Sequence, residues 1–320
     1  MTNKPPSAEG IRLNWFDIPL HTRHIIELWL GSEIVNISSQ TSGFSPGVSA
    51  TFTLADARNV FIKAVGPKPN PGIASVHRHE LNIVSQLPND IPVPRLLWSY
   101  DDLETGWVTL IFENIDGWHP ANPWKQDELR RAIDALVDLN GKLTPSPLLV
   151  RDASSAFAET VCGWQKLKNE QSIFNNQLDD WSVRHLNQLA EIEALAPNAV
   201  TGNTLLHFDV RADNMLFTSD CVWFFDWPHA RIGAEWVDVV CFAPSVAMQG
   251  GLLPEKLCVQ HPAFQRADPM FITAAVVSLA GFFTYQALQL PPPGLPTLRA
   301  FQDAQGQVAR QWIVDRTDLD

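Results

Sequence analysis

The chain has 320 residues, of which 45% are hydrophobic and 18% are charged, and its formal net charge is −12. This composition is typical of a soluble globular protein with one large domain or two smaller ones. The acidic balance argues against a general nucleic-acid-binding protein, because such proteins present a basic surface to the phosphates.

The cysteines and the apolar stretches indicate the compartment. The four cysteines form neither C-x-x-C pairs nor a zinc pattern, and we interpret them as reduced. The N-terminal segment MTNKPPSAEG has no apolar run that could serve as a signal peptide. The longest uncharged stretch, 269–298, contains polar residues and ends in prolines, so it predicts a buried helix and not a membrane span. We therefore expect a cytoplasmic protein with no membrane or nucleic-acid partner; no feature indicates an oligomeric state.

Strand-like segments dominate the chain up to about residue 115. They cover residues 33–43, 51–65, 91–102 and 106–115. Residues 51–65 predict two strands joined by the turn ADAR, and Lys63 is the lone charge in VFIKAV. Residues 74–88 predict a helix on which Glu80 shares the apolar face with Ile83. The region is therefore expected to be a small antiparallel sheet with one helix across it.

Helical periodicity dominates after Asp116-Gly117. Residues 127–143 and 177–195 carry apolar side chains at helical spacing, and helices resume from about Trp236. This change of pattern predicts two domains, 1–115 and 116–320.

Two short predicted strands carry oxygen-bearing side chains between these helices. In LLHFDVRADNMLF (205–217), Asn214 follows Asp209 after five residues, and Asp226 ends the strand VWFFD. Phosphoryl transfer needs such a set, since one Asp orients a hydroxyl while an Asn and a second Asp hold Mg²⁺. Taken alone, D-x-x-x-x-N also fits ordinary turn chemistry.

The first region supplies matching parts for a nucleotide. A lysine on a strand and a glutamate on the following helix can pair, so that Lys63 faces the α- and β-phosphates. In the loop within residues 38–50, Gly43 and Gly47 allow the backbone to approach phosphates, and Ser45 offers a hydroxyl. The alternatives are a surface lysine and a solvated glutamate. The order of all these features along the chain favours a kinase.

This order of motifs resembles the aminoglycoside phosphotransferase and choline kinase superfamily of small-molecule kinases. The resemblance covers nearly the whole chain and is most specific in residues 205–240, around HFDVRADN and FFDW. It implies a two-lobed, protein-kinase-like α+β fold, with an N-terminal antiparallel sheet plus one helix and a mostly helical C-terminal lobe. It also implies that the cofactors are Mg²⁺ and ATP, with GTP as the alternative nucleotide.

The resemblance implies a role for each matching residue. Asp209 is expected to be the catalytic base, and Asn214 and Asp226 are expected to bind Mg²⁺. The nucleotide-binding residues are expected to be Gly43, Ser45, Gly47, Lys63, Glu80 and the backbone of Glu113 and Ile115 in the hinge between the lobes. Among them, Lys63 holds the phosphates and Glu80 holds Lys63.

Positions beside Asp209 either brace the loop or depart from the family pattern. His207 and Asp238 are expected to brace the loop. Phe208 stands where the family usually has glycine. Our hypothesis for Arg211 is a catalytic one, that it neutralises the γ-phosphate in the transition state. The alternative is a salt bridge to Asp213.

The resemblance implies that the acceptor is a hydroxyl of a small molecule, such as an aminoglycoside, an amino sugar or an amino alcohol. A protein acceptor is disfavoured, because only residues 227–237 separate Asp226 from Asp238, which is too short for a peptide-docking segment. The remaining alternatives are a catalytically inactive nucleotide-binding scaffold and, less favoured, a protein kinase. Candidates for the acceptor pocket lie near Trp227, His229 and Glu235 and in the helical region 155–185, which contains Trp164 and Trp181. Core packing is the favoured alternative for any single tryptophan.

Overall fold

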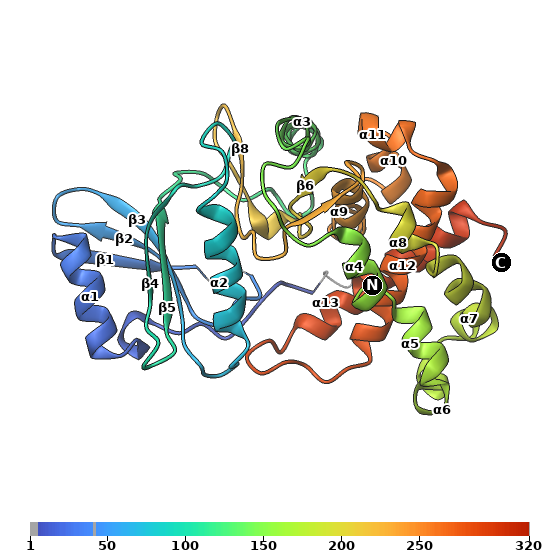
Figure 1. Ribbon diagram of the computed structural model, residues 1–320, viewed down its shortest axis with the longest axis horizontal. Helices are drawn as coiled ribbons and strands as arrows, with labels where there is room; N and C mark the ends of the chain where they lie inside the picture. Colours follow the sequence, from blue (N-terminus) through green and yellow to red (C-terminus); the bar gives the residue numbers. More distant parts are fainter. Residues whose placement is uncertain (1–5, 41–42, 320) are drawn as a thin grey trace.

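The computed structural model describes residues 6–40 and 43–319. A five-stranded antiparallel sheet lies at one end of the molecule, and helices make up the other end (Figure 1). The strand order is β1-β2-β3-β5-β4. The bounds are Ile34–Ser39 (β1), Val48–Leu54 (β2), Asn59–Val65 (β3), Leu96–Asp101 (β4) and Val108–Glu113 (β5). The predicted α+β class is confirmed.

The hairpin predicted for residues 51–65 is formed by β2 and β3. Ala57 lies in its turn with a φ of 69°. The register places Lys63 opposite Ser49 of β2 and opposite Leu110 of β5, so the lysine lies on the central strand. Because side chains alternate along a strand, Lys63 points to the face opposite that of its neighbours in sequence.

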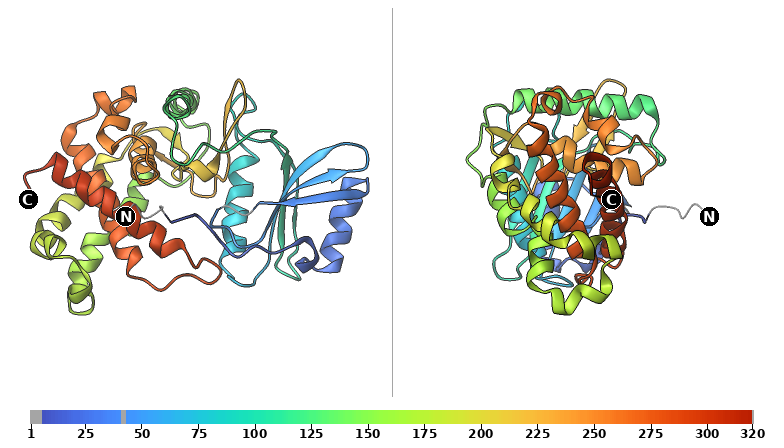
Figure 2. Two further views of the ribbon diagram at one scale, coloured as in Figure 1. Left: turned by 180° about the vertical axis from the view of Figure 1, so that it is seen from behind. Right: turned by 90° about the vertical axis from the view of Figure 1, so that its right-hand side faces the viewer.

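A helix packs against each face of the sheet (Figures 1 and 2). On one face, α1 (Leu20–Leu30) buries Ile26 and Leu30 in a cluster with side chains of β2 and β3. On the other face, α2 (Ile73–Val84) buries Ile73 against β5. The sequence pattern did not indicate α1, which has no side-chain cap and buries only three residues.

The C-terminal part contains most of the helices. Their bounds are Gln126–Lys142 (α3), Ala153–Glu159 (α4), Gly163–Asn169 (α5), Gln171–Phe174 (α6), Asp180–Glu193 (α7), Ala196–Ala199 (α8), Val237–Met248 (α9), Pro254–Cys258 (α10), Pro262–Arg266 (α11), Pro269–Ala287 (α12) and Leu298–Arg316 (α13), and the 3₁₀ helices of the chain are Trp15–Asp17 (η1), Asn175–Gln177 (η2) and Ala212–Asn214 (η3). The two helices predicted near residues 127–143 and 177–195 are confirmed as α3 and α7.

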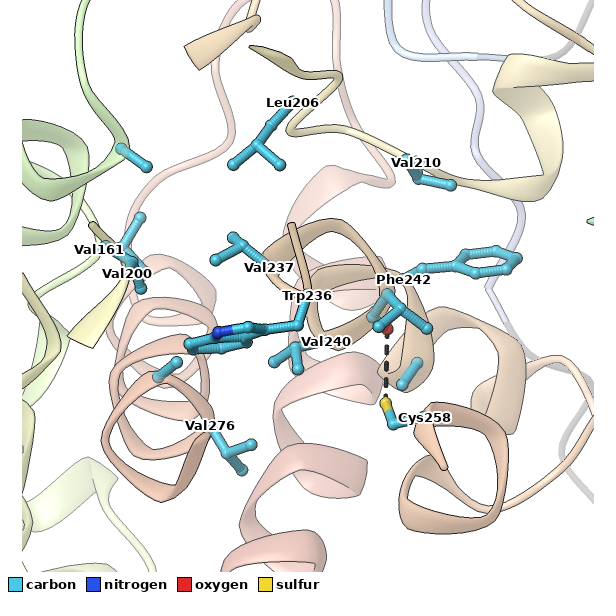
Figure 3. Close-up of a cluster of buried hydrophobic side chains, with 14 of the residues drawn as sticks. Val161, Val200, Leu206, Val210, Trp236, Val237, Val240, Phe242, Cys258 and Val276 are labelled. Carbon is cyan, nitrogen blue, oxygen red and sulfur yellow. Dashed lines mark hydrogen bonds between the residues drawn. The ribbon is translucent and has the colours of Figure 1, made fainter. Parts of the chain in front are cut away.

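The core of this part is built around α9. Trp236, Val240 and Phe242 lie in one buried cluster with Val276 of α12 (Figure 3). The thiol of Cys258 lies in the same cluster and donates a hydrogen bond to the carbonyl oxygen of Val239 at 3.6 Å. All four cysteines are free, as predicted. Burying each large apolar side chain stabilises the fold by about 1.5–3 kcal/mol, so this cluster holds α9 and α12 together.

The predicted buried helix within 269–298 is α12. In the described part of the chain it is the one helix whose length and composition would allow it to cross a membrane, and 61% of its apolar window is buried in the protein. It packs against α13, α5 and α7.

Two small β-ribbons link the helical part to the motif of residues 205–217. In the first, β6 (Thr204–Leu206) pairs with β9 (Arg231–Gly233). In the second, β7 (Met215–Phe217) pairs with β8 (Val222–Phe224). The ribbons fix the ends of two loops, 207–214 and 225–230.

Candidate active site

The D-x-x-x-x-N pair of the first loop is a direct contact. The amide nitrogen of Asn214 donates to the backbone oxygen of Asp209 at 2.8 Å and to its Oδ2 at 3.1 Å. Burial raises the pKa of Asp209, which brings this carboxylate closer to the basicity that a proton acceptor needs. Asp209 and Asn214 thus close loop 207–214 by direct contact.

Arg211 joins two carboxylates of the same loop. Its Nη1 donates to Asp209 Oδ1 at 2.9 Å, and its Nε and Nη2 donate to the two oxygens of Asp213 at 3.0 Å each. Burial alone would lower the pKa of Arg211, but the two carboxylates raise it, so the side chain stays charged. The ion pair to Asp213 considered as the alternative is present, and Arg211 also contacts Asp209.

Asp238 holds the backbone before Asp209. Its carboxylate accepts the N–H groups of His207 and Phe208, each at 2.8 Å. Phe208 has a φ of 65°, a left-handed conformation that costs an L-residue about 1–2 kcal/mol. The two hydrogen bonds that Asp238 accepts offset this cost, so Phe208 adopts the conformation for which glycine is better suited. Burial raises the pKa of Asp238 to about 6.

His207 acts as a neutral brace. Its Nδ1 accepts the backbone N–H of Asp209 at 3.2 Å, so the ring proton lies on Nε2, which donates to the carbonyl of Phe225 at 3.0 Å. Burial lowers the pKa of His207 to about 4. One imidazole thus connects the two loops.

Lys63 connects the sheet to the second loop. Its Nζ donates to Glu80 Oε1 at 2.6 Å and to Asp226 Oδ1 at 2.9 Å. The side chains of Lys63 and Glu80 are almost fully buried. Burial lowers the pKa of Lys63, but the two carboxylates outweigh it and raise the pKa overall. Burial likewise opposes ionisation of Asp226, yet the Lys63 ammonium holds the pKa of this carboxyl below its usual range.

Two cavities meet at these side chains. The first, of about 220 Å³, lies between the sheet and the loops. The predicted site residues that line it are Gly43, Ser45, Lys63, Glu80, Glu113, Ile115, Asn214 and Asp226. The second, of about 480 Å³, is lined by Asp209 and Arg211, and the two cavities share Phe44, Ser45, His77 and Asp226. Loop 207–214 therefore faces both cavities.

Gly47 differs from the prediction. It does not line the first cavity; a Cβ there would lie 2.5 Å from Val65 Cγ1 and 2.7 Å from the carbonyl oxygen of Ala64. Glycine is thus required at this position for the packing of the loop on β3. Gly43 lines the cavity with a φ of 94°. Thr41 and Ser42 of the same loop lie outside the described residues.

Arg12 is a site residue that the sequence did not indicate. It lines the first cavity, and its Nη1 donates to the carbonyl of Ser45. Burial lowers its pKa, while Asp226 and Asp213 oppose this effect. The surrounding IRLNW matches no motif, so only the parallel pairing of Arg12 with Gly47 reveals its place.

Asn214 and Asp226 fit Mg²⁺ by their free oxygens. Within the described residues, Asn214 Oδ1 and Asp226 Oδ2 accept no hydrogen bond, and both residues line the first cavity. Among residues 6–40 and 43–319, no cluster of three or more His, Cys, Asp or Glu side chains could hold a metal ion. Two protein ligands suit Mg²⁺, which usually completes its shell with phosphates and water.

The residues expected around the acceptor divide into three groups. His229 lines the second cavity. Trp227 is fully buried and lines the first cavity only. The other three line neither cavity: Trp164 is fully buried and donates to the Val277 carbonyl, Trp181 donates to the Leu319 carbonyl, and Glu235 contacts Arg266. The two tryptophans thus follow the core alternative, whereas the region 155–185 reaches the second cavity through Ala156, Phe157, Thr160 and Val161. Aromatic residues alone did not distinguish core from pocket.

Comparison with known proteins gives one family. The model of the phosphotransferase enzyme family matches residues 49–267, which include both loops and the Lys63–Glu80 pair. No curated protein matches the chain.

Solved structures with a similar fold include three phosphotransferases. A thermostable mutant of aminoglycoside phosphotransferase APH(4)-Ia, in ternary complex with ADP and hygromycin B, has a TM-score of 0.58 and 14% identity over 92% of this chain and 97% of that chain. The GDP complex of aminoglycoside 2′-phosphotransferase-IIIa has a TM-score of 0.59 and 12% identity over 93% and 99%. Spectinomycin phosphotransferase APH(9)-Ia, with ADP and spectinomycin, has a TM-score of 0.53 and 13% identity over 92% and 98%. At these identities the likeness establishes the shared fold.

Proposed function

Because this chain belongs to the phosphotransferase enzyme family, we propose that it transfers the γ-phosphoryl group of ATP to a hydroxyl of a small molecule in the presence of Mg²⁺. The observation that carries the proposal is the contact of Lys63 with both Glu80 and Asp226 at the junction of the two cavities. This contact joins the nucleotide side of the molecule to the catalytic loop.

The nucleotide is assigned to the first cavity. Lys63 remains charged there and can bind the α- and β-phosphates, while Gly43 and Ser45 cover them from the loop before β2. The backbone of Glu113 and Ile115 lies on the same cavity and can bind the base. The side chain of Glu113 points elsewhere, since it accepts hydrogen bonds from Arg95 at 2.8 and 3.0 Å.

The catalytic loop supplies the proton acceptor. Asp209 lies on the second cavity, and Asn214 fixes its carboxylate through the 3.1 Å contact to Oδ2. An acceptor hydroxyl bound in the second cavity would give its proton to Asp209 as its oxygen attacks the γ-phosphorus. Arg211, beside Asp209, would neutralise charge that develops on the transferring group.

Asn214 and Asp226 would hold Mg²⁺ with their cavity-facing oxygens. When bound, the ion neutralises phosphate charge and orients the phosphates for in-line transfer. Lys63 keeps Asp226 ionised at neutral pH, so this ligand is ready for a cation.

ATP is the expected donor, and GTP is the alternative. The structural neighbours APH(4)-Ia and APH(9)-Ia were solved with ADP, and the 2′-phosphotransferase-IIIa with GDP. The sequence-based acceptor classes are aminoglycosides, amino sugars and amino alcohols, and two of these neighbours hold hygromycin B or spectinomycin. We further propose a lobe boundary at residues 115/116 and a cytoplasmic location.

Two other functions are less well supported. A catalytically inactive scaffold would have no reason to keep the contacts among Lys63, Glu80 and Asp226 together with Asp209 and Asn214. A protein kinase needs a docking segment after the metal-binding Asp; here the residues after Asp226 form loop 225–230 and β9, which pairs with β6.

The test is turnover of Mg-ATP. ADP release is measured with a panel of amino sugars, aminoglycosides, amino alcohols and uncharged alcohols, next to thermal unfolding with and without Mg-ATP. We expect acceptor-dependent ADP release and a raised unfolding temperature. No turnover with any acceptor and no thermal shift would contradict the proposal.

A further inference from the structure

The second cavity carries information on the acceptor, and the inference from it rests on the proposed function. The cavity has a volume of about 480 Å³, within the range of small-molecule sites. Asp209 lies on it, and it meets the nucleotide cavity at Asp226 and His77. A hydroxyl compound bound there would lie next to the catalytic loop.

The wall of this cavity is mainly apolar and aromatic. It is formed by side chains of α4, loop 207–214, α12 and α13. They are Phe157, Phe208, Phe282, Phe283, Leu298 and Phe301. Such a wall favours a ligand with an apolar surface, because binding removes that surface from water.

The carboxylates on the lining are already engaged. They are Asp209 and Asp226, which contact Arg211 and Lys63 at 2.9 Å each. No other Asp or Glu of the described residues lines the cavity. Both oxygens of Asp209 are held by Arg211 and Asn214, and the remaining oxygen of Asp226 is assigned to Mg²⁺. A bound ammonium group would therefore lose its hydration without a free carboxylate oxygen in exchange, which is costly.

The unpaired charge on the lining is positive. Arg231 is half-buried on this cavity and forms no ion pair with any described residue. Its Nη1 donates to the carbonyl oxygens of Ala230 at 2.8 Å and His229 at 3.4 Å, and its Nη2 forms no hydrogen bond with the described residues. The nearby Glu159 pairs with Arg151 at 2.8 Å instead. A planar guanidinium with a free donor suits a carboxylate or a carbonyl oxygen.

A buried amide on α13 also lacks a partner. Gln305 is 4% exposed, lines the cavity, and forms no side-chain hydrogen bond with the described residues. Its neighbour Gln302 differs, because it accepts a hydrogen bond from Arg299 at 2.8 Å. The amide of Gln305 is open to the cavity and has no partner among the described residues, so it is available to a polar group of a ligand.

From these observations we propose that the acceptor is an alcohol with a largely apolar body, no positive charge, and a carboxylate or carbonyl oxygen that binds Arg231. Gln305 binds a second polar group of the same molecule. Aminoglycosides, amino sugars and amino alcohols all carry a protonated amine at neutral pH, so this inference replaces the acceptor classes expected from the sequence with uncharged or anionic alcohols.

Two dyes with one scaffold test the proposal. N-phenyl-1-naphthylamine is neutral, and 1-anilinonaphthalene-8-sulfonate adds one anionic group. Their fluorescence is titrated with the full-length protein saturated with Mg²⁺ and the non-hydrolysable nucleotide AMP-PNP, so that the first cavity is occupied. We expect both dyes to bind, and the polycation kanamycin in large excess to displace neither.

Variants separate the charge from the apolar wall. Arg231→Gln should weaken binding of the sulfonate dye about tenfold, which corresponds to the loss of one charged contact, and should change the neutral dye about twofold or less. Leu298→Glu should weaken the binding of both dyes, because it places a charge in the apolar wall. Thermal unfolding confirms that each variant is folded. Dye binding unchanged by both substitutions would overturn the proposal.

The remaining outcomes separate this inference from the proposed function. Displacement of the dyes by kanamycin, or phosphorylation of kanamycin, overturns the acceptor class and leaves the kinase function standing. If neither dye binds while AMP-PNP does, the proposed acceptor class is likewise overturned and the kinase function still stands. Failure of the folded protein to bind AMP-PNP with Mg²⁺ contradicts the proposed function itself.

Discussion

The guanidinium of Arg211 lies 2.9 Å from the carboxylate of Asp209, the residue proposed to accept the hydroxyl proton. Both side chains are largely buried, and the ring of Phe44 from the loop before β2 lies 5.5 Å from the guanidinium. One cation thus holds the proposed base and approaches the loop that would cover the phosphates. We therefore expect the loss of Arg211 to lower turnover more than the loss of an ion pair at the protein surface would.

The first prediction concerns this pair. Arg211→Ala should lower kcat by roughly 10²–10³-fold, the usual loss when a group that stabilises transition-state charge is removed. The Kd for Mg-ATP should change little. Steady-state kinetics and equilibrium binding measure the two effects.

Asp213→Asn is the matched control for Arg211. It weakens the other ion pair of the arginine, at 3.0 Å, and leaves the contact to Asp209. We expect a much smaller loss in kcat than for Arg211→Ala. If Arg211→Ala and the wild type had equal kcat, Arg211 would have no catalytic role.

The second prediction concerns the buried Lys63–Glu80 contact. Glu80→Gln removes one of the two carboxylates that hold Lys63, and we expect the free energy of unfolding to fall by about 2 kcal/mol, as for other hydrogen bonds to charged groups. The KM for ATP should rise because the ammonium is no longer fixed from both sides. Chemical denaturation and kinetics measure these changes.

Asp56→Asn serves as control for Glu80→Gln, since Asp56 lies in the exposed turn of the same hairpin and pairs with Arg58. Its KM for ATP should match that of the wild type. If the KM for ATP of Glu80→Gln matched that of this control, the position of the Lys63 ammonium would not depend on Glu80 of α2.

The third prediction concerns the left-handed backbone at Phe208. Phe208→Gly and Phe208→Ala both remove the ring, which packs against Phe157 at 6.0 Å. They differ in the cost of the φ of 65°. The glycine variant should be more stable than the alanine variant by about 1 kcal/mol. Denaturant unfolding measures the difference, and a more stable alanine variant would contradict the strained conformation.

The fourth prediction is the tautomer of His207. Long-range ¹⁵N–¹H spectra should show a proton on Nε2 and none on Nδ1. The pattern should persist to pH 5.5, because the pKa is lowered to about 4. A protonated Nδ1 at pH 7 would contradict the hydrogen bond from Asp209.

The lowered pKa of His207 also makes the stability of the protein depend on pH. Burial lowers this pKa from 6.5 in the unfolded chain to about 4 in the folded protein. Its contribution to stability is therefore complete above pH 6.5 and is lost as the pH falls towards 4.

Local patterns and motif order predicted much of the fold and part of the site. The alternation of 51–65 and the helical spacing of 74–88 placed Lys63 and Glu80 on adjoining elements, and their expected contact is present. The spacing of Asp209 and Asn214 likewise predicted one loop. These contacts follow from short-range geometry, which the sequence encodes directly.

The remaining site residues depend on contacts between distant segments. Arg12 reaches the first cavity because its segment pairs with Gly47, and Gln305 reaches the second because α13 packs on α12. Gly47 looked like a phosphate-binding residue, but the close approach of β3 explains it. No local pattern marks such positions, since burial and pairing there are set by the tertiary structure.

The central claim is most directly tested by transfer of label from [γ-³²P]ATP to alcohols in the presence of Mg²⁺, with the wild type and Asp209→Ala side by side. The account predicts a labelled small molecule with the wild type and none with Asp209→Ala, while both proteins bind ATP with similar affinity. Equal labelling by both proteins, or no labelling by a folded wild type across the whole panel, would contradict it.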